Sequence, residues 1–354
     1  MTLMTRPLRV AMVAPVATSV PPPLSGSIET MTSLLTEGLV ARGHDVTLFA
    51  TGGSTTRARL HATFAHGYRE DPAMWPWELC EVFNLSAAVE RASSFDVIHY
   101  QSEYYPVSVA FGRLTATPLV QTLHHAPSPG EIAMWSLYSD APFVAVSRAQ
   151  ADLMTGLNVV GTVHHGLDPA AFPFRATPDD YLLFLGRFTE GKGVLQAIDI
   201  ARSVNIPLLL AAKENDYYNE VVAPHVDGTH ARWVGEVGHA EKVALLGGAR
   251  ALLYPVQSGE PFGLVLTEAM ACGTPVAALD RGAVPELVED GVTGGVFGSA
   301  EALVAGLPRV MALDRSAVRA MAVDRFGADR MVDGYVSVYE AMLRNAGRRS
   351  AAVT

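Results

Sequence analysis

Short apolar segments alternate with helical stretches along the whole chain, and this alternation limits the possible folds more than any other feature. In the first half the apolar segments are residues 8–14, 45–50, 96–100, 118–122, 142–146 and 159–163. In the second half they are residues 181–185, 207–211, 231–234, 251–254 and 275–278. Apolar strands separated by helices are typical of parallel sheets that are covered by helices on both faces. The pattern therefore predicts an α/β protein with doubly wound parallel sheets.

A proline-rich stretch divides this pattern into two halves. The chain has 354 residues, which is enough for two domains of ordinary size. Prolines interrupt any regular element between residues 168 and 179. We therefore predict a first domain at residues 1–170 and a second domain from residue 171. Because open α/β sheets bind ligands at the carboxyl ends of their strands, two facing domains of this kind predict an inter-domain cleft lined by the loops after strands.

The composition argues against several classes of protein. Apolar residues make up 49% of the chain and charged residues 18%, which indicates a folded protein. No apolar run is long enough to predict a transmembrane segment, and the net charge of −10 argues against a nucleic-acid partner. Cys80 and Cys272 lie far apart and form no metal or redox motif, so we expect a cytoplasmic protein.

The segment from residue 259 to residue 270 carries the strongest chemical signal. Glu260 and Glu268 are separated by a Pro-Phe-Gly turn and the start of an apolar helix. A carboxylate in such a helix needs a partner, because an unpaired buried charge costs several kcal/mol. The backbone N–H groups of Phe262, Gly263 and Leu264 are the unpaired donors of the first helical turn, which can bind an anion. The alternative is one solvated glutamate and one capping glutamate.

This segment, followed by Ala-Met-Ala-Cys-Gly-Thr-Pro-Val at residues 269–276, resembles the Glu-x7-Glu motif of bacterial retaining glycosyltransferases of family 4. The resemblance implies the GT-B fold, in which two Rossmann-like domains bind the acceptor and the nucleotide sugar. It implies that Glu260 contacts the donor sugar and that Glu268 contacts the ribose. The turn amides would meet the sugar and the diphosphate. It also implies that the second domain ends at residue 327 and that a helix at residues 328–354 crosses back to the first domain.

The loop after the strand at residues 181–185 supplies two cations, Arg187 and Lys192. It nearly matches the phosphate-binding P-loop, but Gly193 replaces the Ser or Thr that would hold Mg²⁺, so an ATPase is a weak alternative. Two cations could clamp a diphosphate without a metal, and the resemblance places this Arg and this Lys on the donor phosphates. The other interpretation is that both are surface charges that pair with Glu190.

His124 and His125 follow the strand at residues 118–122. The resemblance implies that His124 touches the donor sugar and the reacting centre. There it could donate a hydrogen bond and, if protonated, offset negative charge. A structural role is the alternative for a histidine at this position. The segment His164-His165-Gly166-Leu167-Asp168 is similar to a family segment at the domain junction, and we interpret it as structural, with Asp168 capping a turn.

Two further loops are candidates for donor binding. Gly26 lies in the loop after the first strand, where a glycine allows close approach of the backbone to a ligand. The resemblance implies that this loop lies near the donor phosphates, and that the backbone near Val237 holds the nucleobase. No Gly-x-Gly-x-x-Gly follows the first strand, which argues against a dehydrogenase.

Together these observations and the resemblance predict a metal-independent hexosyltransferase that uses a UDP- or GDP-sugar as its substrate and needs no cofactor. Retention of the anomeric configuration is implied by the resemblance alone. Up to residue 168 the chain has nine arginines and fourteen acidic residues, so it lacks the basic surface typical of membrane docking. We therefore predict a small soluble acceptor. The aromatic-rich stretches at residues 71–77 and 101–105 could stack on an acceptor or belong to the core, so the acceptor and the oligomeric state stay open. The alternatives are an epimerase or phosphorylase of the same fold, and the ATPase.

Overall fold

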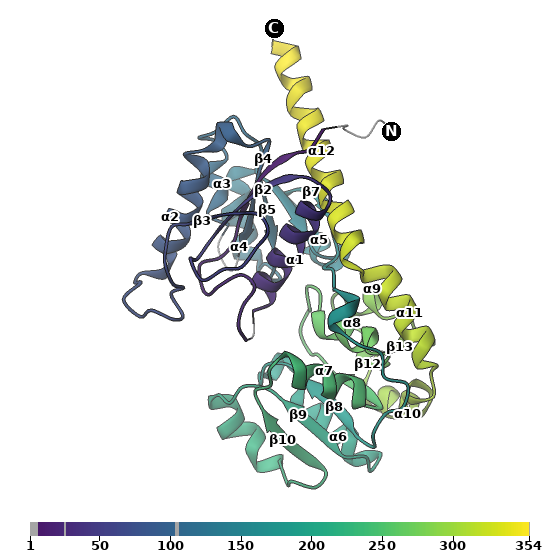
Figure 1. Cartoon of the computed structure of the whole chain (residues 1–354). Helices are drawn as coiled ribbons and strands as arrows, with labels where there is room; N and C mark the ends of the chain where they lie inside the picture. The colour runs from purple at the N-terminus through teal and green to yellow at the C-terminus, as the bar shows by residue number, and fades with distance from the viewer. Residues whose placement is uncertain (1–5, 25, 103–105, 354) are drawn as a thin grey trace. The chain divides into compact units, whose positions relative to one another are not determined.

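The computed structural model describes residues 6–24, 26–102 and 106–353 (Figure 1). The chain divides into two compact units, one comprising Met1–Gly166 with Ala328–Thr354 and the other Leu167–Gly327. The first boundary falls a few residues before the predicted residue 170, because the N–H of Leu167 donates to the carbonyl of Phe326 within the second unit, at 2.8 Å. The residues at 103–105, which belong to one predicted aromatic stretch, lie outside the described part of the chain.

The first unit contains a seven-stranded parallel sheet in the order β3-β2-β1-β4-β5-β6-β7. Its strands are β1 Arg9–Val13, β2 Asp45–Ala50, β3 Arg59–Ala62, β4 Val97–Ser102, β5 Leu119–Leu123, β6 Pro142–Ala145 and β7 Asn158–Thr162. Its helices are α1 Ser27–Ala41, α2 Trp77–Val89, α3 Ser108–Phe111, α4 Pro129–Trp135, α5 Arg148–Leu153 and α12 Ala328–Val353, with short 3₁₀ helices at Ala92–Ser94 and Ser136–Tyr138. The central strands β1, β5 and β6 are almost completely buried, as expected for a doubly wound sheet.

The second unit contains a six-stranded parallel sheet in the order β10-β9-β8-β11-β12-β13. Its strands are β8 Leu182–Leu185, β9 Leu208–Ala211, β10 Ala231–Gly235, β11 Ala251–Tyr254, β12 Val276–Leu279 and β13 Gly294–Phe297. Its helices are α6 Val194–Ser203, α7 His239–Gly248, α8 Leu264–Ala271, α9 Val284–Leu287, α10 Ala300–Met311 and α11 Arg315–Phe326. Short helical turns lie at Pro169–Ala171, Glu190–Lys192, Tyr218–Val222 and Ala223–His225.

The strands predicted from apolar runs are all present, and the prediction of parallel α/β sheets is confirmed. The sequence missed β3 and β13, which lie at the edges of their sheets. β3 reads Arg-Leu-His-Ala and is largely exposed, whereas β13 begins with two glycines. Edge strands bury less surface than central strands, so they need no continuous apolar run and give a weaker signal.

Helix α12 packs tightly into the first unit although it follows the second unit in sequence. A Cβ added at Gly38 on α1 would come within 2.5 Å of the side chain of Val332 on α12. A Cβ at Gly161 on β7 would come within 2.6 Å of Val338. These contacts tie α12 to both a helix and a strand of the first unit. Among the described helices, α12 included, none combines the length and the apolar character needed to cross a bilayer.

Candidate functional site

Lys192, Tyr254 and Glu260 meet at the carboxyl edge of the second sheet. Lys192 lies in the loop after β8, Tyr254 ends β11, and Glu260 lies in the loop after β11. β8 and β11 are neighbours although β9 and β10 lie between them in sequence, so the strand order reverses here. Such a reversal point is where open α/β sheets bind their ligands. The local topology therefore agrees with a binding site at these residues.

Lys192 and Tyr254 both contact one carboxylate oxygen of Glu260. The ammonium of Lys192 contacts Oε2 of Glu260 directly, and the hydroxyl of Tyr254 donates to the same oxygen at 2.5 Å. The side chain of Glu260 is only 12% exposed. Burial, together with the charge of Glu260, raises the pKa of Tyr254 well above its ordinary value, so the phenol keeps its proton. The alternative interpretation, in which Lys192 is a surface charge that pairs with Glu190, does not hold, since its partner is Glu260.

A glycine lets the two loops come together. Gly193 has the left-handed φ of 71°, and a Cβ at this position would come within 2.0 Å of the carbonyl oxygen of Pro255. Beside it, the N–H of Gln257 donates to the carbonyl of Gly191 at 2.8 Å. The loop after β8 is thus fixed against the loop after β11, which holds Lys192 next to Glu260.

Glu268 has the partner that its position in an apolar helix requires. It lies on α8, and its Oε1 is 2.6 Å from the ammonium of Lys242 on α7. The chain has three lysines, at residues 192, 213 and 242, and two of them pair with the two glutamates of the motif. Sequence reasoning predicted that Glu268 needs a partner but did not identify Lys242. The only available signal was the scarcity of lysine.

The amino end of α8 presents unpaired donors beside Glu260. Gly263 is the N-cap, with φ 92°, and no side chain caps the helix. Within the described chain, the N–H groups of Gly263 and Leu264 have no hydrogen-bond acceptor. Phe262 is buried, and its ring packs against Phe326 with ring centroids 6.3 Å apart, so its side chain belongs to the core.

Arg187 and Val237 lie in two loops of the second unit, after β8 and after β10 respectively. Arg187 is exposed, and among the described residues its side chain forms no hydrogen bond or ion pair. Its charge is close enough to affect the pKa of Tyr254. The charge of Arg187 lowers this pKa, whereas burial raises it by more. Val237 lies half-buried between β10 and α7. The structure thus brings Arg187 near the Lys192 cluster and leaves it available to an anion.

In the first unit, His124 follows β5 at the carboxyl edge of the sheet. Its Nε2 lies 2.8 Å from Oε1 of Gln101, and its ring stacks on that of His165 with centroids 5.2 Å apart. Burial, and to a smaller extent the neighbouring His165, lowers the pKa of His124 well below its ordinary value. This lowered pKa disfavours the protonated ring, so it argues against a protonated His124 that offsets negative charge. Asp168 caps a turn as predicted, accepting from the N–H of Ala170 at 3.0 Å.

The remaining candidates of the first unit have structural contacts. Gly26 is the N-cap of α1, and its carbonyl accepts from the N–H of Thr30 at 3.0 Å. His125 lies 3.0 Å from Glu131, which also closes the capping box of α4. In the aromatic stretch at residues 71–77, Trp77 is half-buried and packs on Tyr68 with ring centroids 5.6 Å apart, whereas Trp75 is 75% exposed, so this stretch is not part of the core.

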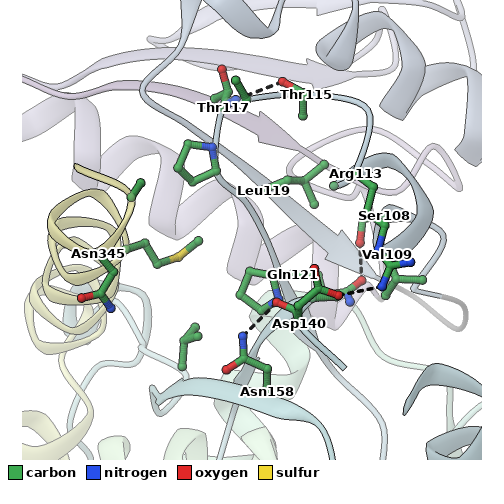
Figure 2. Close-up of a pocket in the computed structure, with 18 residues that line it drawn as sticks. Ser108, Val109, Arg113, Thr115, Thr117, Leu119, Gln121, Asp140, Asn158 and Asn345 are labelled. Carbon is green, nitrogen blue, oxygen red and sulfur yellow. Dashed lines mark hydrogen bonds and ion pairs between the residues drawn. The ribbon is translucent and has the colours of Figure 1, made fainter. Parts of the chain in front are cut away.

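A cavity of about 330 Å³ lies at the opposite edge of the first sheet (Figure 2). It opens near the starts of β5, β6 and β7, where Arg113 pairs with Asp140 at 2.9 Å and Asn158 donates to the carbonyl of Asp140. Figure 2 shows Ser108 bonded to Gln121 in the same wall. None of the predicted site residues lines this cavity, so it is separate from the candidate site.

Comparisons with known proteins match both parts of the chain. The family model described as "Glycosyl transferases group 1" matches residues 171–322, and that described as "Glycosyltransferase Family 4" matches residues 28–171. A glycogen synthase from Mycobacterium tuberculosis is 27% identical, with 88% of this chain and 86% of the relative covered. A phosphatidyl-myo-inositol mannosyltransferase from Mycobacterium leprae is 26% identical, with 96% and 99% covered.

Solved structures agree with these matches. AviGT4, a glycosyltransferase involved in avilamycin A biosynthesis, is 25% identical, with 96% of this chain and 99% of that chain covered and a TM-score of 0.74. HepE from Anabaena, solved in complex with UDP and glucose, is 17% identical, with 94% and 100% covered and a TM-score of 0.69. The second likeness concerns the fold alone.

Proposed function

Because this chain belongs to the glycosyltransferases of family 4 and has the GT-B fold, we propose that it moves a hexose from a nucleotide-diphosphate sugar to the hydroxyl of a small soluble acceptor. The anomeric configuration is retained, and the reaction needs no metal and no cofactor. The observation that carries this proposal is the convergence of Lys192, Tyr254 and Glu260 beside the uncapped amino end of α8.

The departing diphosphate is stabilised by fixed positive groups. An ammonium has three N–H donors, and the contacts of Lys192 with Glu260 and Tyr254 occupy two of them. The third donor, the guanidinium of Arg187 and the N–H groups of Gly263 and Leu264 then bind the phosphate oxygens. Since these groups supply positive charge where negative charge develops, a divalent cation is not required.

The two glutamates bind the hydroxyl groups of the donor. In Glu260 the described contacts occupy Oε2, so Oε1 accepts from hydroxyls of the hexose. Equatorial hydroxyls near carbons 3 and 4 suit this position, which favours a glucose-like sugar of a UDP or GDP donor. In Glu268 the contact with Lys242 occupies Oε1, so Oε2 accepts from the ribose. The backbone near Val237 holds the nucleobase edge.

Retention follows from attack on the same face as the leaving group. No carboxylate nucleophile is needed in this scheme, because the leaving phosphate accepts the proton of the attacking hydroxyl. The mannosyltransferase among the relatives supports a hexose as the transferred group. The acidic balance of residues 1–168 supports a soluble acceptor over a membrane lipid. The ATPase alternative loses its basis, because the loop with Arg187 and Lys192 falls within the matched glycosyltransferase segment.

A screen of nucleotide sugars in EDTA tests the proposal. One donor among UDP, GDP, ADP and TDP sugars is expected to stabilise the protein, by about 2.7 kcal/mol at a concentration of 100 Kd. With that donor and a panel of soluble acceptors, NMR should show a product with the donor's anomeric configuration. Turnover that EDTA abolishes and Mg²⁺ restores would contradict metal independence. Cleavage of the donor without transfer would favour the epimerase or phosphorylase.

Tyr254→Phe is expected to lower kcat/KM for the donor roughly tenfold, since a hydrogen bond to a charged group contributes about 1.5 kcal/mol. The phenol shares Oε2 of Glu260 with Lys192, and without it the carboxylate is less firmly oriented. Tyr217→Phe is the matched control, because the Tyr217 hydroxyl makes no hydrogen bond among the described residues. Equal kinetics for the two variants would show that Tyr254 does not orient Glu260.

A further inference from the structure

A buried amide lies directly behind His124. Gln101, which is 2% exposed, is on β4 and lies within the first unit. Its Oε1 is 2.8 Å from Nε2 of His124. Its Nε2 lies 3.6 Å from Sδ of Met12 and 3.3 Å from the nearer ring nitrogen of His99. The amide therefore contacts a different partner at each end.

The partner at the far end determines which way the amide points. A thioether sulfur can accept a hydrogen bond but cannot donate one, so the NH₂ group of Gln101 faces Met12. Its carbonyl oxygen then faces His124, and this oxygen can only accept. The proton of the neutral His124 ring must therefore be on Nε2. Within the described residues, the other ring nitrogen of His124, Nδ1, has no hydrogen-bond partner.

We infer that Gln101 is a positioning residue, which fixes the His124 ring in the Nε2–H tautomer and so keeps Nδ1 as a hydrogen-bond acceptor for a hydroxyl of a bound substrate. This inference rests on the proposed function. It reverses the role expected for His124 from the sequence, which was to donate. The ring that Gln101 holds also stacks on His165, so its plane is fixed as well as its tautomer.

A network of buried hydroxyls anchors the arrangement. Nε2 of His99 lies 2.8 Å from the hydroxyl of Thr122, and Nδ1 lies 2.6 Å from that of Tyr339. The hydroxyl of Thr122 lies 3.0 Å from that of Tyr335. Polar groups in such a network hold one another in place, because each loses its partner if another moves. Two residues of α12 thus support the strand that carries Gln101.

The tautomer can be measured directly on the full-length protein labelled with ¹⁵N-histidine. Two-bond ¹H–¹⁵N spectra distinguish the Nε2–H from the Nδ1–H tautomer, and His124→Gln identifies the signals of His124. Wild type is expected to show the Nε2–H form, and Gln101→Met, which lacks the acceptor, a mixture of both forms. A wild-type Nδ1–H form, or a tautomer unchanged in a folded Gln101→Met variant, would overturn the inference.

Kinetics test the role of the accepting nitrogen. The amide oxygen of asparagine can occupy the place of Nδ1, whereas the amide of glutamine reaches the place of Nε2. His124→Asn is therefore expected to keep a kcat about tenfold higher than His124→Gln. Gln101→Met is expected to lower kcat more than it changes KM. The reverse order of the two His124 variants would overturn the inference. Absence of transfer with every donor would contradict the proposed function and leave the tautomer measurement intact.

Discussion

Lys192→Ala is expected to lower kcat/KM for sugar transfer roughly 100- to 1,000-fold, the effect of removing one fixed donor to a developing negative charge. The ammonium is positioned by Glu260 and by the Gly193 turn, so it needs no rearrangement to meet a phosphate. Steady-state kinetics with the donor identified in the screen measure the effect. Most of the loss should appear in kcat, because charge on the leaving group is greatest in the transition state.

Two further variants separate chemistry from folding in this experiment. Arg309→Ala removes a cation of the same unit whose ion pair with Asp290 is exposed, at 3.0 Å, and it should leave transfer unchanged. Lys192→Arg keeps the charge but alters its geometry, so an intermediate rate is expected. Because Lys192→Ala leaves Glu260 with one fewer partner, its circular dichroism and Tm must be compared with wild type. A folded Lys192→Ala variant with normal kinetics would refute the assignment of Lys192 to the diphosphate.

Arg315→Met is expected to destabilise the second unit by about 3–5 kcal/mol without changing the site. Arg315 is 9% exposed and donates to four acceptors from three segments of the chain. These are the carbonyls of Arg175 at 2.8 Å, Ala249 at 2.9 Å and Gly247 at 2.7 Å, and the hydroxyl of Thr274 at 2.8 Å. Burial lowers the pKa of Arg315, but an arginine stays charged at neutral pH. Methionine fills similar space and leaves all four acceptors without this donor.

Thermal unfolding measures this effect. For a unit of this size, 3–5 kcal/mol corresponds to a decrease in Tm of about 6–20 °C. Arg309→Met is the matched control, and its Tm should change little because its ion pair is exposed. A decrease of less than about 2 °C for Arg315→Met would show that the four acceptors find water or other donors.

The role of a residue was predictable where it depends on a continuous sequence pattern. It was not predictable where it depends on which strands are neighbours in the sheet. The apolar helix around Glu268 predicted a buried carboxylate with a partner, and the structure supplies one. Lys192 and Tyr254 meet only because β8 and β11 are neighbours, and no local pattern states which strands pair. Gln101 was part of an aromatic-rich stretch whose role stayed open. The role of Gln101 depends on its contacts with Met12, which belongs to β1, and with His124, which follows β5.

The return of α12 to the first unit has a consequence for synthesis on the ribosome. The segment Leu167–Gly327 is complete before α12 has been made, so it can fold while the earlier residues still lack part of their core. His99 and Thr122 acquire the hydroxyls of Tyr339 and Tyr335 only when the last helix emerges. The core of the first unit can therefore be completed only after the second unit has been translated.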